Sequence, residues 1–506
     1  MGPGGARGVV VIGDTLLDID VEGSVDRLCP DAPAPVLAVE GEHDRPGGAG
    51  LAAVLVAGRD VPVRLVTALQ DDGPGQRLRR LLDGAVDVVA GPAEGGTVVK
   101  CRLRAGGRSM LRTDRGAARP EPGFAAGLDL DTALADAGAV LVSDYGRGVA
   151  ADPDVRAALA RVITRRVPVV WDPHPRGADP VPGATVVTPN LAEARGAAGG
   201  APVPGSGVPA ALELAARLLT RWEARSVAVT LGRSGAVVRH RHGACSAAPA
   251  PVVQESDPCG AGDHFAGGVA AALARGETVD DAVAEAVAGT ADFIALGGGA
   301  TVRREGARWT QPRGAGAAPR PAGTGLDAAG ANPERVRAGG GTVVAAGGSF
   351  DVLHTGHTDT LAAARALGDC LLVLVNSDES VRRRAGPGGP VVPLAERVAA
   401  LAALECVDAV AVFDADDPRR VLDVLRPDLW VKGGDHDPAE LPETPLVRSW
   451  GGEVVAVPYR PARTTVSAPV RHPAGARART RQQGAPQQAT PQPRAPKPRT
   501  RRRPSP

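Results

Sequence analysis

Residues 347–357 read Gly-Gly-Ser-Phe-Asp-Val-Leu-His-Thr-Gly-His, and this stretch decides the fold of the C-terminal part of the chain. A β-branched run at 342–346 predicts a strand before it, and the pattern at 358–367 predicts a helix after it. His354 and His357 therefore fall at the first turn of a helix, where free backbone N–H groups attract phosphate. Two imidazoles there can donate to oxygens that gain charge during attack on an α-phosphate. A surface histidine pair is the alternative, and the order of strand, glycines, histidines and helix disfavours it.

The H-x-G-H motif in this stretch is typical of the nucleotidyltransferase superfamily, which the chain resembles over residues 341–466. Three further runs carry the resemblance, at 373–384, 393–413 and 427–436. In order and spacing they are similar to the adenylyltransferase part of the bifunctional enzymes of ADP-heptose biosynthesis. The resemblance implies a small Rossmann-like α/β domain that transfers a nucleotidyl group from a nucleoside triphosphate to a sugar phosphate and releases pyrophosphate.

The same resemblance implies roles for individual residues of this part. His354 and His357 are expected to act at the α-phosphate. Lys432 is expected to be catalytic as well, by bringing its own positive charge to the triphosphate. A single Arg or Lys at a strand end is usually a solvated charge, and only the assembled set favours phosphate binding. The residues expected to bind nucleotide or phosphate are Ser349, Phe350, Asn376, Asp378, Arg397, Thr464 and Thr465.

The first three hundred residues alternate short apolar runs with Ala/Leu-rich helical patterns. This alternation is typical of an α/β protein with a doubly wound sheet, in which ligands bind outside the carboxyl ends of the strands. The residues at those ends are Asp14, Asp144, Asp172, Asn190 and Gly232. Two segments break the alternation and predict strand pairs, 19–25 with 35–41 and the hairpin at 97–114. We expect these strands to form a small sheet that covers the site as a lid.

Segment 257–265, DPCGAGDHF, carries the chemistry of this half. Gly260, Ala261 and Gly262 open a predicted helix, so that their N–H groups form an anion hole for a transferring phosphoryl group. Asp263 follows directly, and a carboxylate there can take the proton of an acceptor hydroxyl. An ordinary helix N-cap is the alternative for the glycines alone.

Over nearly its whole length this half resembles the ribokinase-like carbohydrate kinases. The motifs that carry the likeness are Gly13-Asp14 with Asp18, RPGGAG, TPNLAE and DPCGAGD. The resemblance implies that Asp263 is the catalytic base and that Asn190 and Glu193 organise Mg²⁺ and phosphate, without a dedicated metal site made of protein ligands alone. Gly232 is expected near the nucleotide. The residues expected to hold the sugar are Asp14, Asp18, Gly47 and Gly48.

The two resemblances together imply a bifunctional enzyme of ADP-heptose biosynthesis. The first half would phosphorylate heptose 7-phosphate at its anomeric hydroxyl with ATP and Mg²⁺, and the second would adenylylate heptose 1-phosphate. Sugar phosphates and ATP are then its partners, and the family suggests a homodimer. One alternative keeps both chemistries for another sugar or polyol phosphate, for example with cytidylyl transfer. Another is a scaffold with decayed sites.

Composition predicts the organisation of the chain. A chain of 506 residues is too long to fold around a single hydrophobic core. We predict a kinase domain at 1–300, a Gly/Ala/Pro/Arg-rich linker at 301–340 and the nucleotidyltransferase at 341–466. Residues 467–506 carry ten Arg or Lys and no acid. We expect this tail to be disordered, the alternative being weak, purely electrostatic binding of polyanions. Six cysteines without metal-ligand spacing, and no long apolar run, predict a cytoplasmic protein without a membrane span.

Four positions depart from the patterns of the two families. Leu51 stands where the kinases usually carry an asparagine near the sugar, and Cys259 replaces a threonine before the glycines. Gly389 replaces a basic residue, and Arg463 stands where a serine is usual. The family has a closing helix after this position, and the residues that follow Thr465 do not show a helical pattern. We therefore expect altered affinity or sugar preference.

Overall fold

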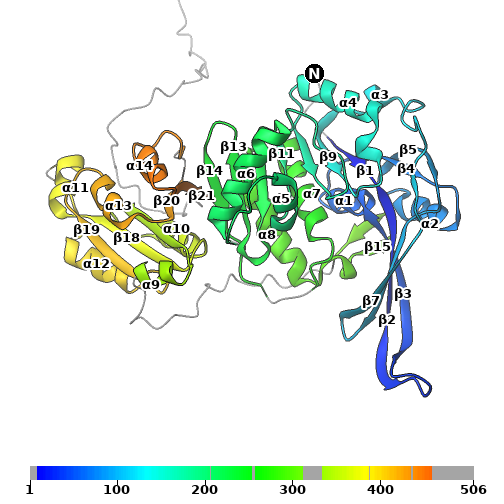
Figure 1. Ribbon diagram of the computed structural model, residues 1–506, viewed down its shortest axis with the longest axis horizontal. Helices are drawn as coiled ribbons and strands as arrows, with labels where there is room; N and C mark the ends of the chain where they lie inside the picture. Colours follow the sequence, from blue (N-terminus) through cyan, green and yellow to red (C-terminus); the bar gives the residue numbers. More distant parts are fainter. Residues whose placement is uncertain are drawn as a thin grey trace, which may run out of the picture. The chain divides into compact units, whose positions relative to one another are not determined.

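The computed structural model describes residues 8–205, 207–253, 257–311, 333–386, 388–434 and 437–458. Thr464, Thr465, Arg463 and the basic tail lie outside these ranges. The helices and strands described before residue 312 are called the N-terminal half below. Those described after residue 332 are called the C-terminal half. Figure 1 labels the elements of both halves.

A mainly parallel sheet organises the N-terminal half, with the strand order β14-β13-β12-β11-β10-β9-β1-β4-β5-β8. The first strand is central, and it pairs in parallel with β9 on one side and β4 on the other. Every residue of β9 is buried, which explains its uninterrupted apolar run. The strands are β1 (Gly8–Gly13), β4 (Val63–Leu69), β5 (Asp87–Glu94), β8 (Arg119–Pro120), β9 (Ala137–Ser143), β10 (Val169–Asp172), β11 (Val186–Val187), β12 (Ser226–Thr230), β13 (Ala236–His240) and β14 (Cys245–Ala248).

Helices cover both faces of this sheet, and the predicted doubly wound α/β fold is confirmed. One face packs against α1 (Ala49–Ala57), α7 (Ala261–Ala274) and α8 (Val279–Ala295). The other face packs against α3 (Leu130–Ala133), α4 (Pro153–Thr164), α5 (Leu191–Ala198) and α6 (Val208–Trp222). The amphipathic helix α2 (Gly73–Leu82) follows β4.

The two strand pairs that break the alternation form a separate four-stranded sheet in the order β3-β2-β6-β7. Its long antiparallel pair β2–β3 and its hairpin β6–β7 match the predicted pairings, and the hairpin turns at Gly106 and Gly107 with positive φ angles. In Figure 1 the strands β2, β3 and β7 project away from the main sheet. A role as a lid stays a prediction. The strands are β2 (Thr15–Leu28), β3 (Pro35–Gly48), β6 (Val99–Ala105) and β7 (Arg108–Arg115).

The C-terminal half contains the parallel strand order β19-β18-β17-β20-β21. Helices α10 and α12 cover one face, whereas α9, α13 and α14 cover the other. The strands are β17 (Val343–Gly348), β18 (Cys370–Asn376), β19 (Ala409–Phe413), β20 (Leu429–Gly433) and β21 (Glu453–Val457). The helices are α9 (Pro333–Ala338), α10 (Thr355–Arg365), α11 (Asp378–Ala385), α12 (Leu394–Ala402), α13 (Arg419–Leu425) and α14 (Thr444–Ser449).

Gly347 near the end of β17 is fixed by close packing. A Cβ atom at this position would lie 2.5 Å from Cη2 of Trp430, which is fully buried on β20. Any larger residue would have to displace the indole ring. The glycine thus serves the core here, and the strand can end close to the histidine-bearing turn.

A hairpin of β15 (Arg303–Glu305) and β16 (Arg308–Thr310) falls within the range that composition assigned to the linker. Trp309 is 5% exposed, packs in the core beside α1, and donates its indole N–H to the Leu81 carbonyl at 3.2 Å. Composition did not show this because a single tryptophan among Gly, Ala and Arg has no periodicity. The division into domains itself stays a prediction.

We predict that Trp309→Ala lowers the unfolding free energy of the N-terminal half by about 3 kcal/mol, because a buried indole leaves a cavity. Denaturant unfolding followed by circular dichroism measures this loss. Arg308→Ala, whose side chain is 78% exposed, is the matched control and should change stability little. Equal stability of the two variants would contradict a packing role for Trp309.

Candidate active sites

Asp263 lies in the first turn of α7, at the point where the glycine-bearing turn enters the helix. Gly260 takes the left-handed conformation with φ of 80°, and α7 begins at Ala261. The Asp263 side chain is buried, and this burial raises its pKa to about 7. Its hydrogen-bond donor is the Tyr145 hydroxyl, 2.8 Å from Oδ2 and 3.0 Å from Oδ1, and this bond lowers the pKa. A carboxyl with a pKa near neutrality suits a general base.

Asp14 positions the loop that carries Tyr145. Its Oδ2 atom accepts the backbone N–H groups of Tyr145 at 3.0 Å and Arg147 at 2.9 Å, and Oδ1 accepts that of Val149 at 3.1 Å. Gly48 lies beside the same carboxylate-bearing turn, where its φ of 59° and the close Asp14 carbonyl require a glycine. The direct sugar contact expected of Asp14 and Gly48 stays a prediction. Tyr145 was missed because its hydroxyl reaches Asp263 only in the folded chain.

A cluster of buried charges lies between the small sheet and the turn before α7. Asp18 pairs with Arg45 at 3.1 Å and with Arg102 at 3.2 Å, and Arg45 also bonds to Asp20. Arg45 Nη2 lies 3.4 Å from the Cys259 sulfur, one residue before Gly260. The cluster therefore places two guanidinium groups near Cys259, beside the turn that the sequence predicts as an anion hole, and neither arginine was singled out from the sequence.

Gly47 and Leu51 are placed by packing around this cluster. A Cβ on Gly47 would lie 2.9 Å from Asp18 Oδ2, so the glycine lets β3 approach the carboxylate. Leu51 is buried in α1, and a Cβ on Gly260 would lie 3.0 Å from its Cδ2 atom. The leucine in place of the usual asparagine thus packs beneath the anion-hole turn.

Asn190 and Glu193 form a capping box at the start of α5. Asn190 Oδ1 accepts the N–H groups of Ala192 and Glu193 at 2.9 and 3.0 Å, and Glu193 Oε2 accepts that of Asn190 at 2.9 Å. Burial raises the pKa of Glu193. The pKa of Asp172 is raised well above its usual range, by burial first and then by the charges of Asp263 and Glu193.

Asp172, Glu193 and Asp263 thus place three carboxyl groups with raised pKa values at the end of the sheet. Their oxygens are the hard donors that Mg²⁺ prefers, so the residues present fit the implied ion. Within the described ranges, no three His, Cys, Asp or Glu side chains form a ready-made metal cluster. Gly232, expected near the nucleotide, follows β12 with φ of 59° and begins a short 3-10 turn.

His354 and His357 meet at the start of α10, as the sequence predicts. His354 is the N-cap residue, and the two rings stack with centroids 3.9 Å apart. Burial, and then the neighbouring His354, lower the pKa of His357 to about 4, so the ring is neutral at pH 7. The Nδ1 atoms of both rings are buried, and a backbone hydrogen bond with Val352 partly offsets the fall in the pKa of His357. Phe350, with φ of 48°, packs its ring edge-on against His357.

Arg397 lies on α12 and donates to the ends of β17 and β18, and its expected phosphate contact stays a prediction. The side chain is fully buried, and its guanidinium donates to the carbonyls of Ser349 at 2.7 Å and Asn376 at 2.8 Å. It also bonds to Asp378 Oδ1 at 2.7 Å and to the Val392 carbonyl at 2.9 Å. These bonds join the ends of β17 and β18, so the arginine holds the nucleotide-site loops in place. Periodicity alone places Arg397 on a helix and says nothing of which loops surround it.

Lys432 lies near the end of β20, with Nζ 3.8 Å from Glu443 Oε1 and 4.9 Å from the centre of the Trp430 ring. Burial lowers its pKa, and the Glu443 carboxylate opposes this effect. The expected phosphate contact of Lys432 stays a prediction. Gly389 lies in the loop before α12, and nothing in the structure explains its replacement of a basic residue.

Comparisons with known proteins agree with this pair of sites. A family model described as pfkB family carbohydrate kinase matches residues 6–302, and one described as cytidylyltransferase-like matches residues 345–466. The fold and sites therefore define a carbohydrate kinase joined to a nucleotidyltransferase. The bifunctional protein HldE of Streptomyces coelicolor is 48% identical over 93% of this chain and 97% of that protein. The chain belongs to the family of bifunctional HldE proteins.

Further relatives and solved structures extend the comparison. The bifunctional protein HldE of Halorhodospira halophila is 38% identical over 89% of this chain and 94% of its own length. Ribokinase from Thermotoga maritima is 19% identical, with a TM-score of 0.45, over 57% of this chain and 93% of that structure. Phosphofructokinase-2 from Escherichia coli is also 19% identical, with a TM-score of 0.47, over 58% of this chain and 95% of that structure.

Among the helices that the structure describes, none combines the length and the apolar character that a membrane span requires.

We predict that Tyr145→Phe shifts the acid limb of the kinase pH profile to higher pH. The base must be deprotonated to act, and the Tyr145 hydrogen bond holds the Asp263 pKa down, so its loss raises that pKa. Rates measured from pH 5.5 to 9 should fall most at low pH and recover toward wild type at high pH. A uniform loss across the whole range would contradict a role in tuning Asp263.

His357→Ala should slow nucleotidyl transfer by about a hundredfold or more, since it removes one donor to the charge that develops at the α-phosphate. Pyrophosphate release measures this step. Asp263→Asn is the matched control, because it should abolish sugar phosphorylation and leave pyrophosphate release from sugar 1-phosphate intact. Loss of both activities in either variant would argue against two separate sites.

Proposed function

We propose that the chain phosphorylates D-glycero-D-manno-heptose 7-phosphate at its anomeric hydroxyl with ATP, and transfers an adenylyl group from ATP to heptose 1-phosphate. The observation that carries the kinase proposal is the buried Asp263 in the first turn of α7, whose carboxyl has its pKa raised to about 7 by burial. The observation that carries the second activity is the stacked pair of His354 and His357, in which burial lowers the pKa of His357 to about 4. Membership of the HldE family supports both steps together.

In the kinase reaction Asp263 takes the proton of the anomeric hydroxyl as its oxygen attacks the γ-phosphorus of ATP. Backbone N–H groups at residues 260–262 stabilise the charge on the transferring phosphoryl group, and ADP leaves. Arg45 and Arg102 add positive charge on the same side. Mg²⁺, held near Asn190 and Glu193, would neutralise phosphate charge when bound.

In the nucleotidyl transfer a phosphate oxygen of heptose 1-phosphate attacks the α-phosphorus of ATP, and pyrophosphate leaves. No proton has to be removed from the attacking phosphate, so the protein contributes positioning and charge stabilisation. His354 and His357 supply N–H donors, and Lys432 supplies a cation. The position of the stacked rings at the start of α10 supports a ligand contact at this helix entrance.

The two activities are not consecutive, because a phosphatase must remove the 7-phosphate between them. We propose that two separate domains carry the activities, with residues between the hairpin β15–β16 and α9 joining them.

The cytoplasm is the proposed compartment, since both reactions need ATP. A homodimer formed through the small β-sheet is proposed from family likeness and from its exposed apolar residues Leu28, Val39, Met110 and Leu111.

Mass spectrometry of the products tests this assignment. Purified chain given ATP, Mg²⁺ and heptose 7-phosphate should yield only a heptose bisphosphate, and addition of a matching phosphatase should yield ADP-heptose. Asp263→Asn should block the first product and His357→Ala the second. Because the matching family model is cytidylyltransferase-like, CTP is run in parallel. Pyrophosphate release with CTP and not with ATP would reject the adenylyl assignment.

A further inference from the structure

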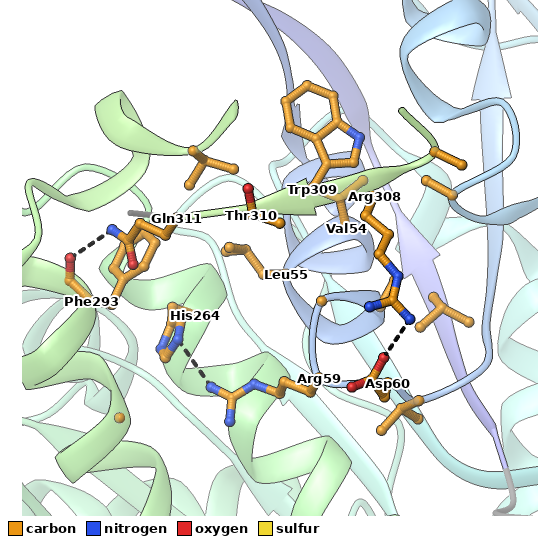
Figure 2. Close-up of a pocket in the computed structure, with 18 of the residues that line it drawn as sticks. Val54, Leu55, Arg59, Asp60, His264, Phe293, Arg308, Trp309, Thr310 and Gln311 are labelled. Atoms are coloured by element: carbon orange, nitrogen blue, oxygen red, sulfur yellow. Dashed lines mark hydrogen bonds and ion pairs between the residues drawn. The ribbon is translucent and has the colours of Figure 1, made fainter. Parts of the chain in front are cut away.

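A cavity of about 730 Å³ lies behind the catalytic helix of the kinase half, between α1, α7, α8 and the hairpin β15–β16. Figure 2 shows Arg59 and His264 joined by a hydrogen bond at its wall, with Gln311 and Trp309 along the hairpin side. Asp263, Tyr145 and the anion-hole residues do not line this cavity. It is therefore distinct from the site already described.

Arg59 gives the cavity an uncompensated positive charge. Its Nη2 atom donates to His264 Nε2 at 3.0 Å, and among the described residues no carboxylate lies within ion-pair distance of it. Glu285 is the acid that most favours the charge on Arg59, but that carboxylate is bound by Arg275 at 2.6 Å. Asp60 lines the cavity and pairs with the exposed Arg308 at 3.0 Å. Asp292 also lines it, on the exposed side of α8.

His264 cannot supply the missing negative charge. Burial, and then the neighbouring Arg59, lower its pKa to about 3, so the imidazole is neutral. With Nε2 accepting from Arg59, the proton sits on Nδ1, which donates to Thr290 Oγ1 at 2.9 Å. The ring stacks on Phe293 with centroids 4.5 Å apart. A half-buried guanidinium whose partner is a neutral ring favours an anion beside it.

Two glycines leave the space that the guanidinium and a ligand need. A Cβ on Gly268 of α7 would lie 3.3 Å from Arg59 Nη2, and one on Gly289 of α8 would lie 3.7 Å from the same atom. Apolar side chains, among them Val54, Leu55 and Trp309, share the rest of the wall with polar ones such as Thr310 and Gln311. A cation on such a mixed wall suits a small organic anion that has both polar and apolar parts.

We propose that this cavity is a second ligand site, in which Arg59 binds the oxyanion group of a small phosphorylated or carboxylated metabolite and thereby changes the kinase rate. His264 follows Asp263 directly in the first turn of α7. An anion that draws the Arg59 N–H groups away from His264 Nε2 loosens the link between α1 and the helix that carries the base. The site needs no assumption about which sugar the kinase uses.

Calorimetry on the full-length protein tests the binding. Both nucleotide sites are first saturated with Mg²⁺ and the β,γ-methylene analogue of ATP, and inorganic phosphate, glycerol 3-phosphate and citrate are then titrated separately. At least one probe should bind saturably at one site, and the phosphate and citrate arms distinguish the two anion types. Arg59→Gln should weaken that binding at least tenfold. Arg161→Gln, exposed on α4 and paired with Asp131, is the matched control and should bind as the wild type does.

A second variant keeps the proposal testable if Arg59→Gln folds poorly. Gly289→Leu fills the space beside the guanidinium, replaces a helical glycine and leaves the charge in place, so it should keep the melting temperature and lose the binding. Absence of saturable binding by all three probes to the wild type, or equal binding to wild type and both variants, would overturn the site.

Kinase initial rates with and without the bound probe test the coupling. The rate of the wild type should change at least twofold at saturating probe, whereas the rates of Arg59→Gln and Gly289→Leu should not respond. Pyrophosphate release by the C-terminal half serves as the internal control and should not change. Saturable binding with an unchanged wild-type kinase rate would overturn the effect on catalysis.

Discussion

Burial of the Asp263 carboxyl at the first turn of α7 is the constraint on which the kinase half depends. A carboxylate removed from water takes up a proton near neutral pH unless its charge is stabilised. Here burial raises the pKa to about 7, and the Tyr145 hydroxyl moderates the rise. Asp14 fixes the loop of Tyr145 through three backbone N–H bonds. The end of β1 therefore sets the environment of a base on a helix far away in the sequence.

The function proposed for the C-terminal half stabilises anionic groups by a different means. Its histidines are stacked and His357 is neutral, so the site offers N–H donors in place of fixed positive charge at the helix entrance. Neutral donors bind phosphate less strongly in the ground state and still respond to charge that grows during attack. The fully buried Arg397 ties the surrounding loops together, which keeps the donors in position.

Both halves use the turn from a strand or loop into a helix, yet they place different groups there. In α7 that turn also connects the base to the opposite side of the helix, because Asp263 and His264 are adjacent. Asp263 accepts a hydrogen bond from the Tyr145 hydroxyl, and His264 accepts one from Arg59 at the wall of the cavity in Figure 2. A ligand behind the helix and a substrate in front of it would thus contact consecutive residues.

The sequence by itself determined the βα alternation, the strand pairs of the small sheet and the helix starts at Gly260 and His354. These features follow from periodicity, turn residues and backbone conformation, which are local properties. Only the tertiary structure decided that Tyr145 bonds to Asp263, that Arg45 reaches Cys259, and that Arg397 binds loop carbonyls. Each of these contacts joins residues far apart in the chain, and their geometry depends on how strands and helices pack.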